Sequence, residues 1–107
     1  MISSCEYIEV ITTFATSDEA KSFAKKVLEN KLATCCSIEE IESIYRWKGK
    51  VENEHELQLT IKTTVDLYDA VEKFIIQNHS YETPQIICLP IINGSKDYLE
   101  WIKQETK

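Results

Sequence analysis

The side chains best suited to chemistry in this sequence gather in one short segment, His79-Ser80-Tyr81-Glu82-Thr83-Pro84. The segment is predicted to be a loop, where functional residues are often found. Imidazole and carboxylate can share a metal ion or exchange a proton. His79 and Glu82 are therefore a candidate metal or proton-transfer pair. The alternative is that His79 only caps the end of a preceding helix, where the helix dipole favours a histidine.

A second group of titratable residues surrounds His55, which alternates with Glu52, Glu54 and Glu56. These carboxylates could attract cations weakly, but charged residues in such a strand also prevent strand-to-strand aggregation. We interpret His55 as an exposed strand residue. Farther along, Lys62 lies among polar positions, where it either holds an anion or is solvated.

The four cysteines offer thiol ligands but form no metal-binding motif. They are Cys5, Cys35, Cys36 and Cys88, and no two have the C-x-x-C spacing of zinc ribbons or thioredoxin-like motifs. Cys35 and Cys36 would point to opposite faces of a strand, so they cannot easily share one metal ion. We expect reduced, mostly buried thiols.

Other sequence features exclude whole classes of function. Gly49 and Gly94 are the only glycines, too few for a dinucleotide or phosphate loop. The hydrolase and metalloprotease motifs G-x-S-x-G and H-E-x-x-H are absent as well. No nucleophile with an adjacent base can be assembled, so we expect a protein without catalytic activity.

Length and charge narrow the class further. The 107 residues, 43% of them hydrophobic, predict a single domain over 1–107. A net charge of -6 argues against a nucleic-acid binder, which needs clustered Lys and Arg. We find no apolar run long enough for a membrane span and no features of a signal peptide at the start, so we expect a soluble, cytoplasmic protein.

The spacing of apolar residues predicts seven elements. They are a strand over 6–15, a helix that begins after Thr16 and ends near Asn30, strands over 34–47 and 50–63, a helix over 66–77, a strand over 85–91 and a short helix after Ser95. Thr16 and Glu19 fit a capping box. The order β-α-β-β-α-β-α predicts an α+β, ferredoxin-like fold, with the first two helices on one face of a four-stranded antiparallel sheet.

The two middle strands are predicted to form an extended hairpin that turns at Lys48-Gly49. Each strand has roughly 13 residues, against a usual length of about 5–6. Helices of a dozen or so residues cannot cover that length, because they rise less per residue than strands. The apolar tip residues Ile44, Tyr45 and Trp47 would be exposed. We therefore expect the tip to pack on other copies in a symmetric homo-oligomer.

Side-chain alternation makes three further predictions. In the first strand of the hairpin, the apolar residues fall on even-numbered positions up to Ile38 and on odd-numbered positions from Ile41 onward. A strand with alternating side chains needs a bulge, or a change in which sheet face is apolar, to do this. In the next strand Leu59 is expected to point inward and Glu56 outward. The continuous apolar run over 85–91 predicts a strand covered on both faces.

Five blocks of sequence follow one another in the order of a known family's motifs. They are Leu32-Ala33-Thr34-Cys35 with Ile38, the hairpin Ser43-Ile44-Tyr45-Arg46-Trp47-Lys48-Gly49-Lys50, Glu56 with Ile61-Lys62-Thr63-Thr64, His79 with Tyr81, Thr83 and Pro84, and Gly94 with Tyr98-Leu99 and Trp101-Ile102. Together they resemble the CutA family of divalent-cation tolerance proteins over essentially the whole chain. Four positions depart from the family pattern: Ser80 replaces a usual Pro, Gln85 replaces a usual Glu, and Cys36 and Ser37 replace a common Val-Asn or similar pair.

The resemblance implies a ferredoxin-like homotrimer assembled through the long hairpins, with clefts between subunits and a shape similar to PII signalling proteins. It implies tolerance of divalent metals, copper above all, with metal contacts at His79 and Cys35. Glu82 completes the expected metal set. No enzymatic activity is attached to the family, and its eukaryotic members are associated with anchoring of acetylcholinesterase.

Two functional hypotheses follow. The first is a trimeric protein that binds copper or another divalent cation in an inter-subunit cleft. The alternative is a PII-like sensor of a small ligand, or a scaffold that anchors a protein. In both cases we expect no organic cofactor and no nucleic-acid or membrane partner. The residues expected to line the cleft are Tyr45, Trp47, Lys50, Glu56, Lys62 and Tyr81.

Overall fold

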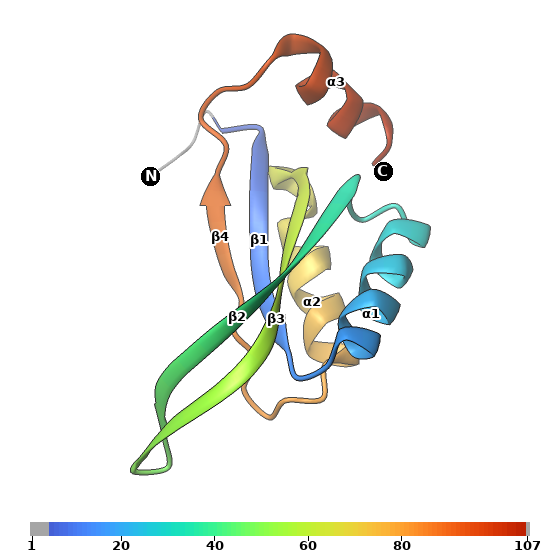
Figure 1. Cartoon of the computed structure of the whole chain (residues 1–107). Helices are drawn as coiled ribbons and strands as arrows, with labels where there is room; N and C mark the ends of the chain where they lie inside the picture. The colour runs from blue at the N-terminus through green and yellow to red at the C-terminus, as the bar shows by residue number, and fades with distance from the viewer. Residues whose placement is uncertain (1–4, 107) are drawn as a thin grey trace.

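The computed structural model describes residues 5–106 as four strands and three α-helices in the predicted order (Figure 1). The elements are β1 (Tyr7–Phe14), α1 (Ser17–Glu29), β2 (Cys35–Trp47), β3 (Lys50–Thr64), a 3₁₀ turn (Val65–Leu67), α2 (Tyr68–Asn78), β4 (Ile87–Pro90) and α3 (Lys96–Gln104). The predicted α+β class is confirmed. None of these helices combines the length and apolarity needed to cross a lipid bilayer.

The strands form one antiparallel sheet in the order β2-β3-β1-β4. β1 is central: its partner on one side is β3, with Phe14 opposite Leu57, and its partner on the other is β4, with Ile11 opposite Ile87. α1 and α2 lie side by side on one face of this sheet (Figure 1). The opposite face is left without a helix layer from these two elements, and it carries the site described below.

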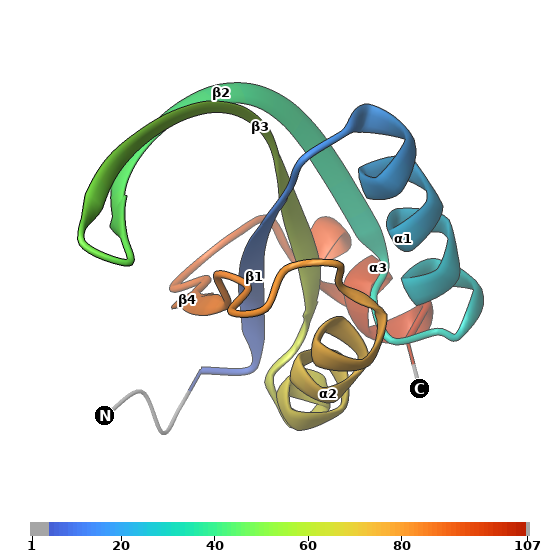
Figure 2. The ribbon, with the colours of Figure 1, turned by 90° about the horizontal axis from the view of Figure 1, so that it is seen from below.

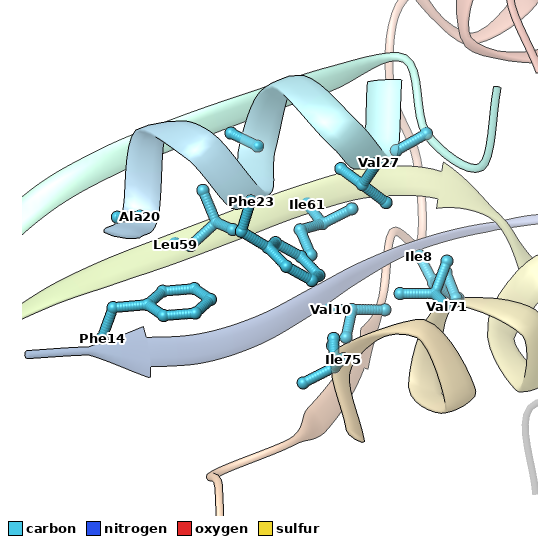
Figure 3. Packing of buried hydrophobic residues seen from close by; sticks show 12 residues of the cluster. Ile8, Val10, Phe14, Ala20, Phe23, Val27, Leu59, Ile61, Val71 and Ile75 are labelled. Carbon is cyan, nitrogen blue, oxygen red and sulfur yellow. The ribbon is translucent and has the colours of Figure 1, made fainter. Parts of the chain in front are cut away.

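The hydrophobic core lies between the sheet and these two helices (Figure 3). Alternate residues of β1 point into it, so Ile8, Val10 and Phe14 are almost fully buried. Leu59 and Ile61 of β3 meet them, as predicted. The helices contribute Ala20, Phe23, Ala24, Val27, Val71 and Ile75. Their spacing of three or four residues gives each helix one apolar stripe, which seats it on the sheet.

The start of α1 is held by its cap and also reaches toward the site. The Thr16 side chain accepts a hydrogen bond from the backbone N–H of Glu19 at 3.2 Å, which confirms half of the predicted capping box. The Glu19 carboxylate instead accepts from the backbone N–H of Ser80 at 3.3 Å. The first turn of α1 is thereby tied to the loop that follows α2.

The β2–β3 hairpin is an unbroken ladder from Cys35–Lys62 to Trp47–Lys50. Lys48 and Gly49 turn the chain with φ of 51° and 82°, the positive values that a two-residue hairpin turn needs. The described ladder contains no bulge, so the predicted alternative holds: the apolar residues of β2 change from one face of the sheet to the other between Ile38 and Ile41. Because β1 ends opposite Leu57, the paired segments 41–47 and 50–56 extend beyond the sheet. We call residues 41–56 the hairpin arm; it curves strongly (Figure 2).

Two predictions are wrong. β4 is shorter than the predicted strand over 85–91 and is not covered on both faces: Ile87 and Leu89 remain 45% and 43% exposed. The reason is that Ile87 and Leu89 pair with Ile11 and Glu9, so their side chains point to the face of the sheet that α1 and α2 do not cover. Among the described strands, β4 pairs with β1 alone and lies at the edge of the sheet. The second helix was expected to start at residue 66 with Ala70 inward. A 3₁₀ turn precedes α2, and Ala70 is exposed.

Candidate functional site

A cleft of about 830 Å³ lies between the hairpin arm and the loop over residues 80–85. The arm supplies one wall because its strands curve away from the sheet (Figure 2). The loop supplies the other, and β1 contributes Thr13. The lining residues are Thr13, Ser43, Ile44, Tyr45, Trp47, Glu52, Glu54, Glu56, Ser80, Tyr81, Glu82, Thr83, Pro84 and Gln85. The cleft thus brings together segments far apart in the sequence.

The cleft is acidic. Glu52, Glu54 and Glu56 share one face of β3, at a spacing of about 6.6 Å for alternate strand residues. Glu82 adds a carboxylate from the loop, and no lysine or arginine among residues 5–106 lines the cleft. Electrostatics at such a surface favour cations over anions.

Two tyrosine–glutamate hydrogen bonds order the cleft. The Tyr45 hydroxyl donates to Glu54 Oε1 at 2.6 Å, across the two strands of the arm. The Tyr81 hydroxyl donates to Glu56 Oε2 at 2.7 Å, joining the loop to the arm. Glu56 was predicted to point outward, yet it is only 7% exposed. It does lie on the face away from the helices, but the loop that carries Tyr81 covers it.

These bonds make both phenols weaker acids. The hydrogen bond to Glu54, followed by burial and the neighbouring negative charges, raises the pKa of Tyr45 from about 10 to about 12. Burial first, and then the hydrogen bond to Glu56, raises the pKa of Tyr81 well above its ordinary value. Both phenols therefore stay protonated at neutral pH and act as hydrogen-bond donors to the carboxylates.

His79 is the residue that anchors the loop. As the C-cap of α2 it occupies the position predicted by the capping interpretation, but its ring contacts β1 rather than the helix. Nε2 lies 2.6 Å from the carbonyl oxygen of Thr13, and Nδ1 accepts from the backbone N–H of Tyr81 at 3.1 Å. Because Nδ1 is an acceptor, the proton belongs on Nε2, which donates to Thr13. Neither nitrogen then has a lone pair free for a metal ion.

The predicted metal set does not converge within one chain. Cys35 pairs with Lys62 of β3, whereas Thr13, which His79 contacts, pairs with Gln58. That offset corresponds to about 13 Å along the strands. Glu82 is mostly exposed, and its Oε1 lies 3.9 Å from Lys48 Nζ. Over residues 5–106 no group of three or more His, Cys, Asp or Glu side chains is placed to hold a metal ion.

The predicted cleft set is brought together in part. Tyr45, Trp47, Glu56 and Tyr81 line the cleft. Lys50 and Lys62 do not; Lys62 instead lies 3.8 Å from Glu9 across the sheet. The predicted set lacked Glu52 and Glu54. Both residues occupy even-numbered positions of β3, as Glu56 does, so strand alternation could have placed them on the same face as Glu56 and in the cleft.

The cysteines differ in their surroundings. All four lie within residues 5–106 and are free thiols. The expectation of mostly buried thiols is wrong, because Cys5, Cys35 and Cys36 are only partly buried and Cys88 is exposed on the edge strand β4. Burial, with a smaller contribution from Cys35, raises the pKa of Cys36 to about 12, which makes this thiol a poor metal ligand at neutral pH.

Comparisons with known proteins agree on one family. The profile of the family described as CutA1 divalent ion tolerance protein matches residues 8–105. The chain is 40% identical over 101 residues to the chloroplastic protein CutA of Arabidopsis thaliana, and the match covers 94% of this chain but 56% of that protein. It is 38% identical over 102 residues to the divalent-cation tolerance protein CutA of Citrobacter koseri, covering 94% and 89% of the two chains.

A solved structure shows the same arrangement of elements. The periplasmic divalent cation tolerance protein CutA of Archaeoglobus fulgidus superposes with a TM-score of 0.92 at 35% identity, over 94% of this chain and 99% of that one. Sequence and structure therefore agree over nearly the whole length of the chain, although it spans little more than half of the plant relative.

Proposed function

The chain belongs to the CutA1 divalent ion tolerance family, and we propose that it serves cation tolerance by binding a divalent metal ion in the acidic cleft of the hairpin arm. Copper is the first candidate ion. The observation that carries the proposal is the set of four carboxylates, from Glu52, Glu54, Glu56 and Glu82, on one concave surface whose described lining holds no lysine or arginine. Carboxylate oxygens accept Cu(II) as well as harder divalent ions.

The ligands proposed here differ from the set expected from sequence. His79 uses both ring nitrogens to hold the loop, and Cys35 lies at the other end of the sheet, so neither fits a metal ion in this cleft. The carboxylates of Glu52 and Glu54 are the proposed first contacts. Because no three ligands converge within residues 5–106, binding by one chain would be weak and would depend on water or on a second copy.

We further propose that the chain assembles as a homotrimer through its hairpin arms. Ile44 and Val51 are 67% and 66% exposed on the arm, and Ile87 and Leu89 are exposed on the edge strand β4. Burial of such apolar surface is the main driving force of protein association. The strand order also supports the ferredoxin-like and PII-like comparison. The proposed setting is cytoplasmic and non-catalytic, and cell fractionation would test the first point.

Calorimetric titration with Cu(II), Zn(II) and Ni(II) tests the metal proposal. Wild type should bind at least one ion, and the double substitution Glu52→Gln with Glu54→Gln should weaken that binding about tenfold or more. Glu42→Gln is the matched control, because Glu42 lies on the same hairpin but its side chain points to the opposite face of the sheet. Equal metal affinity of all three proteins would exclude the cleft as the metal-binding site. Light scattering that gave a monomer at micromolar concentration would exclude the trimer.

A further inference from the structure

The cleft has aromatic side chains on both walls beside its acids. Tyr45 and Trp47 come from the arm, and Tyr81 comes from the loop. From this combination we infer that the cleft binds an organic cation with two or more ammonium groups on a short aliphatic chain. The inference rests on the proposed function in one respect, that the cleft is a cation site, and it differs in the class of cation bound.

The dimensions of the cleft suit an extended cation. Its volume of about 830 Å³ is in the range of small-molecule sites. A bare divalent ion needs several oxygens at about 2.0–2.6 Å, whereas the acids along β3 follow one another at about 6.6 Å. Carboxylates spaced in this way match positive charges that are themselves spaced along a chain.

The aromatic rings add attraction for ammonium groups in particular. An alkylammonium is drawn to the face of an indole or phenol ring, most strongly to Trp. One such contact is already present: Lys48 Nζ lies 5.5 Å from the centroid of the Trp47 ring and 3.9 Å from Glu82 Oε1. The chain's own alkylammonium thus lies near an aromatic ring and a carboxylate that both line the cleft.

Glu56 provides the independent reason for a bound cation. Its side chain is more than nine-tenths buried and lines the cleft. Oε2 accepts from Tyr81, but the carboxylate has no ion-pair partner among residues 5–106. A buried carboxylate without a positive partner is costly. An ammonium group placed against it would offset that cost, and the tyrosine would remain as its second contact.

Titration with spermidine and with putrescine, followed by calorimetry and tryptophan fluorescence, tests the inference on the assembled protein. Spermidine should bind more tightly than putrescine, and added salt should weaken both. Trp47→Leu should lower spermidine affinity about fivefold. Trp101→Leu is the matched control, because Trp101 lies on α3 with nearly the same exposure, 40% against 37% for Trp47.

The outcomes separate this inference from the proposed function. Cu(II) binding without spermidine binding overturns the inference and leaves the metal proposal standing. Spermidine binding that is lowered by Trp47→Leu, without any metal binding, supports the inference and removes the metal proposal. Equal spermidine affinity in wild type, Trp47→Leu and Glu54→Gln indicates diffuse attraction to an acidic protein and overturns the inference. Glu54→Gln keeps the side-chain volume, so it serves if Trp47→Leu fails to assemble.

Discussion

The imidazole of His79 lies flat against the ring of Phe14, with 4.3 Å between the ring centroids and 7° between the planes. Phe14 is the last residue of β1 and belongs to the core, whereas His79 begins the loop that walls the cleft. The stack and the two hydrogen bonds of the imidazole therefore join the core to the candidate site.

Removing this connection should destabilise the fold. His79→Ala loses the ring stack and two hydrogen bonds, so the free energy of unfolding should fall by about 2 kcal/mol, measured by chemical denaturation. His55→Ala is the control, because His55 is exposed on the arm and its replacement should cost less than about 0.5 kcal/mol. Equal effects of the two substitutions would contradict the anchoring role.

Replacement of two buried threonines by valine should change the free energy of unfolding in opposite directions. Thr12 is fully buried, and its hydroxyl has no hydrogen-bond partner within the described chain. Thr12→Val removes that unpaired group and should raise the free energy of unfolding by about 1 kcal/mol. Thr63 is equally buried, but its hydroxyl donates to the carbonyl of Leu32 at 2.7 Å.

Thr63→Val should therefore lower the free energy of unfolding by about 1 kcal/mol, because the Leu32 carbonyl loses its donor. The two variants make the same change in shape at sites of equal burial. A stability change of the same sign in both would show that packing outweighs the hydroxyl. Thermal or denaturant unfolding of the two proteins measures the difference directly.

The Tyr45 phenol should titrate late and affect stability at high pH. Its pKa of about 12 in the folded chain exceeds the ordinary value near 10. The fold thus favours the protonated phenol, and this contribution is complete below pH 10 and disappears as the pH rises toward 12. Ultraviolet titration should show that Tyr45 ionises at a lower pH in Glu54→Gln than in wild type, because the carboxylate is replaced by a neutral amide whose oxygen is a weaker acceptor. Glu42→Gln should leave the titration curve unchanged.

Substitution in the hairpin turn should lower the stability of the fold at Gly49 and raise it at Lys48. Gly49 has φ of 82°, which disfavours any residue with a Cβ, so Gly49→Ala should cost about 1 kcal/mol although the added carbon meets no atom. Lys48→Asn should stabilise the turn, since Asn tolerates positive φ better than Lys. Denaturant midpoints of the two variants should move to opposite sides of wild type.

The cysteines should react with a maleimide in an order set by exposure and pKa. Cys88 is exposed on the edge strand and should be modified first. Cys36 should be modified last, because burial holds its thiol pKa at about 12. Peptide mass spectrometry over a time course gives the order, and Cys88→Ser should abolish the fastest phase. Early labelling of Cys36 would mean that the end of the hairpin near α1 opens readily.

Local sequence signals predicted much of the fold correctly. The Thr16 cap, the Lys48-Gly49 turn and the order of elements each depend on residues close together in the chain, where spacing is informative. The length of β4 and its exposure depend on its place in the sheet. A run of apolar residues is typical both of a strand covered on two faces and of an exposed edge strand, so the sequence could not distinguish these two environments for β4.

The candidate site was predictable only in part for the same reason. Tyr45, Trp47 and Glu56 belong to one hairpin, whose alternation places them on one face. The burial of Glu56 results from Tyr81, which is 25 residues away and covers it from the loop. The role of His79 could not be predicted either, because its partners Thr13 and Phe14 lie more than 60 residues earlier in the chain.

The unbroken pairing of the arm limits how its length can change in evolution. Every pair from Cys35–Lys62 to Trp47–Lys50 follows one register, closed by a two-residue turn. One residue inserted into each strand near Ile41 and Glu56 would move Tyr45, Trp47 and Glu54 to the opposite face and disperse the cleft. Two residues inserted into each strand would restore the face and only displace the tip. Homologous arms that keep this cleft should therefore differ in length by even numbers of residues per strand.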